Sequence, residues 1–118
     1  MYEYKITDIR VVDGDTIEAT VDLGFKCYIR RYIRLYDVDT WETKGPNKIK
    51  GKEAKKHLKE LLNRFSLVVF ISYKDKKGKY GRLLGTLWGQ EEGMIEPMWN
   101  INAEMKAKYS KENKDVMF

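Results

Sequence analysis

Apolar and polar residues alternate along the first part of the chain, which predicts β-strands there. The alternation runs through residues 2–6 and 16–23, and an Asp13-Gly14 turn signal separates these segments. Residues 25–38 form a third, longer segment rich in tyrosine and isoleucine. Because short connections join the three segments, they predict an antiparallel meander.

The apolar spacing becomes helical after a polar loop at residues 40–50. The next segment predicts a helix from about Gly51 to Phe65, with apolar residues three and four positions apart. A nearly continuous apolar run at residues 67–73 predicts a buried strand, and residues 82–88 predict a fifth. A shorter helix is expected within residues 94–108. Its features are Pro97 near the start and an inner face of Met98, Ile101 and Met105.

Five strands, with a helix after the third and a second helix near the end, predict an α+β fold that is mainly β. The inventory fits a five-stranded Greek-key barrel of the oligonucleotide/oligosaccharide-binding (OB) type, although other small α+β folds share it. At 118 residues the chain is long enough for one hydrophobic core. We expect a single domain over residues 1–118, with residues 110–118 as a polar tail.

The net charge of +5 hides an asymmetry. Four acids belong to the candidate site discussed below: Asp13, Asp15, Asp39 and Glu42. Setting them aside leaves 14 acidic residues against 23 lysines and arginines, a net charge of +9. A basic surface around an acidic pocket suits a polyanion that approaches a bound cation. Charge alone favours nucleic acid only slightly, because many small proteins are moderately basic.

The composition does not suggest a membrane-spanning, secreted or disulfide-bonded protein. No apolar run reaches membrane-spanning length, and the charged start of the chain is unlike a secretory signal. Cys27 is the single cysteine, which excludes an intramolecular disulfide, and its neighbours predict a packed side chain in a strand. We therefore expect a cytoplasmic monomer that does not contact membranes.

Two acidic segments are candidates for a metal site. Asp15 follows the predicted turn, and Asp39 follows the third predicted strand. Carboxylates of this kind, with carbonyls and water, suit Ca²⁺ or Mg²⁺, whereas one histidine and one cysteine do not suit a closed zinc site. Asp-Gly is also a common hairpin element, so turn chemistry alone is the alternative explanation for Asp13 and Asp15.

Arginines and a glutamate complete the candidate chemistry. Guanidinium groups match phosphate oxygens and stay charged, so Arg34 and Arg82 are candidates for binding phosphate. Glu42 lies three residues after Asp39, where it can orient or deprotonate a water. The alternatives are an Arg34 paired with a surface acid and a solvated Glu42.

Together these motifs resemble those of the staphylococcal nuclease (thermonuclease) family. The matching segments are Asp13-Gly14-Asp15-Thr16, Arg34 with Asp39-Thr40-x-Glu42-Thr43, and Lys79-Tyr80-Gly81-Arg82. The resemblance extends from about Ile9 to Ser110. It implies an OB-type barrel that hydrolyses DNA or RNA with Ca²⁺, or with Mg²⁺ or another divalent cation. It also implies water as the nucleophile and products that carry a 3′-phosphate.

The resemblance assigns the acids to the cation and the water. Asp15 and Asp39 would bind calcium together with the carbonyl of Thr40, and Glu42 would act on the attacking water. Trp41 stands where the family usually has proline, which would restrict the backbone of Thr40. Its side chain either packs into the barrel or stacks on a base, and we expect packing.

The resemblance assigns the basic residues to the substrate. Arg34 and Arg82 would bind and neutralise the phosphate, while Lys79 and Tyr80 would help to hold the nucleotide. Asp37 adds a carboxylate where the family tends to have glycine or an apolar residue. If it points outward it is harmless, and if it points inward it strengthens cation binding.

Two other functions stay open. The same fold also serves nucleic-acid binding without catalysis, because fold does not fix function. A protein-interaction domain is suggested by an apolar cluster that packing of the second helix also explains. The cluster is Trp88, Met94, Met98 and Trp99. The complete set of acids and arginines favours an enzyme, such as one encoded by a bacterium or bacteriophage. We expect a structural role for His57, the single histidine.

Overall fold

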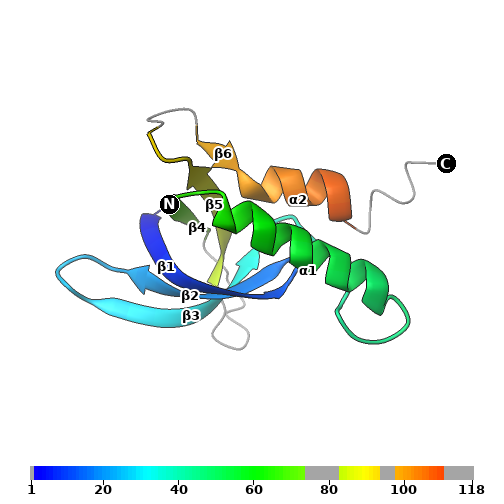
Figure 1. Ribbon diagram of the computed structural model, residues 1–118. Helices are drawn as coiled ribbons and strands as arrows, with labels where there is room; N and C mark the ends of the chain where they lie inside the picture. The colour runs from blue at the N-terminus through cyan, green and yellow to red at the C-terminus, as the bar shows by residue number, and fades with distance from the viewer. Residues whose placement is uncertain (1, 74–82, 94–97, 111–118) are drawn as a thin grey trace.

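The computed structural model describes residues 2–73, 83–93 and 98–110, which form a strand-rich barrel with two helices (Figure 1). The elements are β1 (Tyr2–Asp13), β2 (Thr16–Asp22), β3 (Tyr28–Leu35), α1 (Lys48–Asn63), β4 (Leu67–Tyr73), β5 (Leu83–Gln90), β6 (Trp99–Asn100) and α2 (Ile101–Tyr109). Neither described helix combines the length and apolar character needed to cross a bilayer.

The strands follow the order β3-β2-β1-β4-β5-β6, and all neighbours in this order are antiparallel. A parallel pairing of β3 with β5, from Ile33–Leu83 to Leu35–Gly85, closes the barrel. Five strands make the barrel and α1 follows the third, so the predicted α+β, OB-type fold is confirmed. The two-residue β6, which pairs with the edge of β5, was not predicted.

The apolar faces of the strands and helices form one core. Its largest fully buried side chains come from all parts of the barrel and from both helices: Ile17, Ile33, Leu35, Leu58, Phe70, Leu87, Ile101 and Met105. Helix α1 buries the stripe that the helical spacing predicted. It begins three residues earlier than predicted, at Lys48, because its first turn is exposed and so lacks an apolar pattern.

The β2–β3 connection differs from the prediction. The segment from Gly24 to Lys26 has positive φ angles, of 84°, 54° and 61°, so the chain turns there and β3 starts only at Tyr28. Cys27 lies in this turn and is exposed. The prediction that Cys27 packs within a strand is therefore wrong, because the apolar residues beside it belong to a projecting hairpin.

Helix α2 is fixed to the barrel by a buried asparagine. The side chain of Asn102 accepts a hydrogen bond from the Leu87 N–H at 3.0 Å and donates to the carbonyls of Tyr36 and Gly85, at 2.9 and 3.1 Å. These contacts join β3, β5 and α2 at one point. Ser110, placed in the predicted polar tail, is buried just after the helix.

The start of α2 lies within the predicted region. The side chain of Asn100 caps the helix by accepting a hydrogen bond from the Ala103 N–H at 3.0 Å. Ile101 and Met105 are fully buried, as expected for the inner face, whereas Met98 precedes the helix. Pro97, expected near its start, lies outside the described residues.

A polar pair joins the two helices. His57 of α1 lies 2.5 Å from Glu104 of α2, and the indole N–H of Trp99 donates to the same carboxylate at 2.9 Å. Burial alone raises the pKa of Glu104, but hydrogen bonds from His57 and Trp99 and the charge of Lys108 outweigh it, so its pKa lies below the ordinary value. His57 thus has a structural contact, in line with its expected role.

Replacing Asn102 with alanine should lower the free energy of unfolding by about 2–3 kcal/mol, because it removes three hydrogen bonds and leaves the buried Leu87 N–H without its partner. Urea unfolding followed by circular dichroism measures the effect. The control is Asn63→Ala at the exposed end of α1, which should change stability by less than about 0.5 kcal/mol. Equal losses for both variants would contradict this role for Asn102.

Glu104→Gln should destabilise the protein at neutral pH by about 1–2 kcal/mol, because it removes a charge-assisted contact between the helices. A carboxylate with a lowered pKa stabilises the fold above its ordinary value of 4.5, and this contribution is lost as the pH falls through the folded-state pKa. The difference from wild type should therefore shrink as the pH falls below 4.5. Unfolding curves at several pH values test this, with exposed Glu60→Gln as the control; a pH-independent difference contradicts it.

Candidate active site

The β1–β2 turn packs directly on α1 and on the loop that follows β3. A Cβ atom on Gly14 would lie 2.6 Å from the Ala54 Cβ and 2.8 Å from the Thr40 hydroxyl, so the approach requires glycine. This contact brings Asp13 and Asp15 beside the loop that carries the second acidic segment. The Asp13-Gly14 turn chemistry and the candidate site are therefore parts of one structure.

The carboxylate of Asp15 is held by three neighbours and is 8% exposed. The Thr16 hydroxyl donates to Oδ1 at 2.9 Å, the Thr40 N–H donates to Oδ2 at 3.2 Å, and Arg34 Nη1 lies 3.1 Å from Oδ2. A buried carboxylate needs such partners to stay ionised. These contacts fix its direction before any ligand binds.

Arg34 lies between two candidate acids. Besides Asp15, its guanidinium group is 3.8 Å from Asp39 Oδ1, and it donates to the carbonyls of Asp15 and Val38. The arginine is thus paired with acids, as one alternative proposed, and the acids with which it pairs are those of the candidate site. It is half-buried at the end of β3.

The donor set around Asp15 fits a hard cation. Asp39 has a half-exposed side chain, and the Thr40 hydroxyl is buried with no hydrogen-bond partner among the described residues. No group of three or more acidic, histidine or cysteine residues in that part of the chain is arranged to hold a metal. A cation here would therefore take two carboxylates and complete its shell with carbonyl and water oxygens, which is the chemistry of Ca²⁺ or Mg²⁺.

Asp13 and Glu42 add negative charge to the same place. Burial raises the pKa of Asp13, and the charges of Asp15 and Glu42 raise it further, against a lowering by Lys55 and the Thr43 N–H. Asp13 therefore lies close enough to Asp15 and Glu42 for their charges to disfavour its ionised form, and a cation beside it would offset this repulsion. No individual role was predicted for Asp13. Its position two residues before Asp15 was the available signal.

The two departures from the family pattern take separate positions. Trp41 is half-buried and its indole nitrogen is shielded from solvent, as the packing interpretation expects. Asp37 has a φ of 61° and its carboxylate lies 2.5 Å from the ammonium group of Lys106 on α2. Its side chain is therefore directed to the second helix at the protein surface.

The third predicted segment, with Lys79, Tyr80 and Arg82, lies outside the described residues. The first described residue after it, Leu83, pairs with Ile33, which is the chain neighbour of Arg34. The described part of the chain thus brings together Asp15, Arg34, Asp39 and Thr40, with Glu42 beside them.

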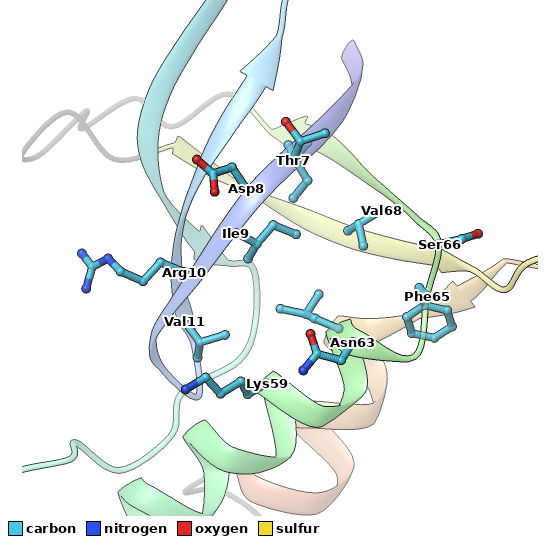
Figure 2. Close-up of a pocket in the computed structure, with 12 residues that line it drawn as sticks. Thr7, Asp8, Ile9, Arg10, Val11, Lys59, Asn63, Phe65, Ser66 and Val68 are labelled. Carbon is cyan, nitrogen blue, oxygen red and sulfur yellow. The ribbon is translucent and has the colours of Figure 1, made fainter.

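A separate pocket of about 480 Å³ lies between β1 and the end of α1 (Figure 2). Figure 2 shows Lys59 and Asn63 of α1 facing the β1 segment from Thr7 to Val11. A register shift between Thr7 and Arg10 bends β1 there, away from the β1–β2 turn. This pocket is therefore separate from the candidate site.

Comparison with known proteins identifies the family. The model described as staphylococcal nuclease homologue matches residues 32–115, which include Arg34 and the Asp39–Glu42 segment but not the β1–β2 turn. SPbeta prophage-derived endonuclease YokF of Bacillus subtilis (strain 168) is 37% identical over 96 residues, which are 79% of this chain and 31% of YokF. Endonuclease YncB of the same organism is 38% identical over 97 residues, 80% of this chain and 44% of YncB.

Protein ParB of Escherichia coli is 35% identical over 99 residues, which are 82% of this chain and 50% of ParB. The chain therefore spans between about a third and a half of the length of these relatives. The barrel, the arrangement of acids around Arg34 and the match over most of the chain agree with one another. The chain belongs to the staphylococcal nuclease homologue family.

Proposed function

We propose that this protein is a nuclease that hydrolyses phosphodiester bonds of DNA or RNA with the help of a divalent cation, Ca²⁺ in the first instance. The observation that carries the proposal is the Asp15 carboxylate, buried and directed by Thr16, Thr40 and Arg34. The relatives YokF and YncB, both named endonucleases, support the same activity.

Asp15, Asp39 and the carbonyl of Thr40 would hold the cation. When bound, a calcium ion would supply positive charge that polarises a phosphate and lowers the pKa of water. The chain's own contribution is preorganisation, because Asp15 already has its direction fixed by hydrogen bonds. Asp13 would add negative charge beside the cation without binding it directly.

Glu42 would accept the proton of the attacking water. It is exposed, and its charge is close enough to Asp13 to raise the pKa of that residue. The backbone of the loop is set by α1, since a Cβ atom on Gly51 would lie 1.9 Å from the Glu42 carbonyl oxygen. The glycine in the first turn of α1 thus sets the backbone position of Glu42, the proposed base.

Arg34 and Arg82 would stabilise the negative charge that develops on phosphorus. Arg34 is held at the end of β3 by the acids of the site, so it would meet a phosphate with little rearrangement. Lys79 and Tyr80 would hold the nucleotide, and we expect 3′-phosphate products from the resemblance to the family. That the protein acts as a monomer in the cytoplasm stays a prediction.

Glu42→Gln should lower the rate of cleavage by about 100-fold or more, because a general base contributes that much to proton transfer. Single- and double-stranded DNA and RNA are incubated with calcium, magnesium or a chelator, and fragments are separated by electrophoresis. Wild type should cleave with calcium and not with chelator, and exposed Glu53→Gln on α1 serves as the control.

Two results would count against this proposal. Unchanged cleavage by Glu42→Gln would remove its role as the base. Binding of nucleic acid without cleavage, under every metal condition, would replace the nuclease with a binding module of the same fold.

Gly51→Ala should lower both stability and cleavage, although alanine is the better helix former by about 1 kcal/mol. The new methyl group would have to displace the carbonyls of Glu42 and Trp41, at an expected cost of about 1–3 kcal/mol. Urea unfolding and the calcium-dependent cleavage rate are measured together, with the exposed neighbour Lys52→Ala as the control. A more stable and equally active Gly51→Ala would show that the loop does not depend on this approach.

A further inference from the structure

The outward face of β3 carries an alternating row of aromatic and arginine side chains. Its members are Tyr28, Arg30, Tyr32 and Arg34. Successive side chains on one face of a strand are about 6.7 Å apart. The opposite face supplies Ile33 and Leu35 to the core, so the row is not needed to fill the barrel.

The aromatic members of this row are open to solvent. Tyr28 is 60% exposed and Tyr32 is 41% exposed, although exposed aromatic rings in a row are costly to leave in water. Figure 1 shows both helices on the other side of the barrel, so neither covers this face. Phe25 continues the apolar surface at the hairpin tip, where it is fully exposed.

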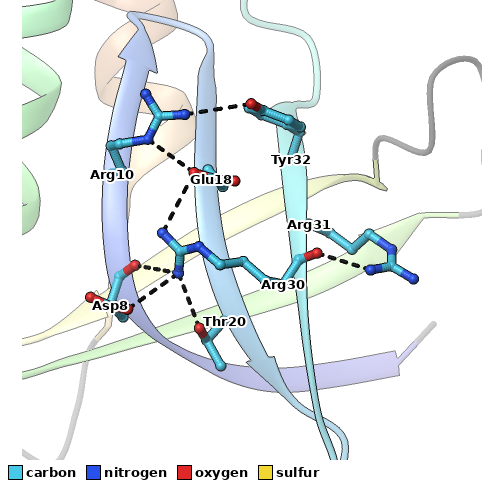
Figure 3. A network of polar contacts seen from close by, with 7 residues as sticks. All are labelled: Asp8, Arg10, Glu18, Thr20, Arg30, Arg31 and Tyr32. Atoms are coloured by element: carbon cyan, nitrogen blue, oxygen red, sulfur yellow. Dashed lines mark hydrogen bonds and ion pairs between the residues drawn. The ribbon is translucent and has the colours of Figure 1, made fainter.

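The basic members are held in place by a network across β1, β2 and β3 (Figure 3). Arg10 and Arg30 share the carboxylate of Glu18, at 2.9 and 3.6 Å, and Arg30 also lies 3.5 Å from the carboxylate of Asp8. Arg30 also donates to the Asp8 carbonyl at 2.8 Å and to the Thr20 hydroxyl at 3.0 Å. These contacts fix its guanidinium group over β2, beside β1.

The row ends at the candidate site. Arg34, its last member, contacts Asp15 and Asp39. A chain that follows the row from Tyr28 to Tyr32 therefore reaches the proposed catalytic acids without leaving β3. Alternating flat rings and cations at a regular repeat suit a polymer with alternating bases and phosphates, and the rings can stack only on bases that are unpaired.

We propose that the outward face of β3 binds a single-stranded segment of nucleic acid, with bases stacked on Tyr28 and Tyr32 and a phosphate beside Arg30, and directs that strand to Arg34. The part of this proposal in which the strand is directed to Arg34 rests on the proposed nuclease function. It adds a binding track outside the phosphate site.

The test measures binding with a chelator present, so that cleavage does not enter. Fluorescence anisotropy follows a labelled oligothymidylate of about twelve nucleotides, a length within the range that one OB fold covers. Tyr28→Ala and Tyr32→Ala should each weaken binding about 5- to 100-fold, the loss expected for one stacked base. Tyr28→Phe and Tyr32→Phe, which keep the ring, should bind like wild type.

Matched controls separate the track from general effects. Ile49→Ala removes another exposed apolar side chain, on α1, and should leave binding unchanged. Arg30→Gln should reduce the slope of log affinity against log salt by about one, as for a single phosphate contact. The loss in the tyrosine variants should be larger for single strands than for a duplex of the same sequence.

The outcomes distinguish this inference from the proposed function. Wild-type binding by both alanine variants, or equal losses for single strands and duplex, would overturn the track even if the protein cleaves nucleic acid. Ring-dependent binding by a protein that cleaves nothing would support the track and reject the nuclease.

Discussion

The seam between β3 and β5 is the constraint on which the barrel, the second helix and the candidate site all depend. It is the one parallel pairing among the described strands, and α1 and β4 supply the long connection that parallel neighbours require. Gly85, which pairs with Leu35 in this seam, also lets β5 lie close to β4, because a Cβ atom there would lie 2.2 Å from the Ile71 carbonyl oxygen. Asn102 then joins both sides of the seam to α2. Arg34 lies within this seam, so the closure of the fold and the placement of its guanidinium group have the same cause.

The site at the end of the seam contains one carboxylate that is paired with an arginine and two further carboxylates close to it. Asp15 is buried, but Arg34 and two hydrogen-bond donors offset the cost of its burial. Asp13 and Glu42 remain close to it, and burial, followed by the charges of Asp15 and Glu42, raises the pKa of Asp13. Gly14 and Gly51 let the turn and the loop lie close against α1, because a Cβ atom at either position would overlap with neighbouring atoms. Carboxylates that the surrounding structure holds close together are typical of a site arranged for a charged ligand.

Much of the fold followed from the sequence because its elements are amphipathic. Strands buried on one face and the inner stripe of α1 leave a periodic pattern, and these were predicted correctly. The exposed first turn of α1 and the hairpin around Phe25 leave no periodic pattern, because exposed segments do not need apolar residues at a fixed spacing. The resemblance to a family placed Arg34, Asp15 and Asp39 in one site, but it did not predict that Arg34 pairs with the two acids. The raised pKa of Asp13 could not be predicted either, since it arises from burial and from neighbours that are distant in the chain.

The alternation of β3 has consequences on both of its faces. Ile33 and Leu35 face inward and are fully buried, so they fix the register of the strand, and a shift by one residue would expose them. The same register then decides which residues face outward, with Tyr32 exposed and Arg34 half-buried at the end. Because burial of the inward side chains fixes the register of the strand, it also fixes the positions of the outward side chains. Such a face can present a regular row of side chains to a polymer with a regular repeat, and the row needs no stabilising contacts of its own beyond those that orient its arginines. On this view the hydrophobic core sets the spacing of the binding surface.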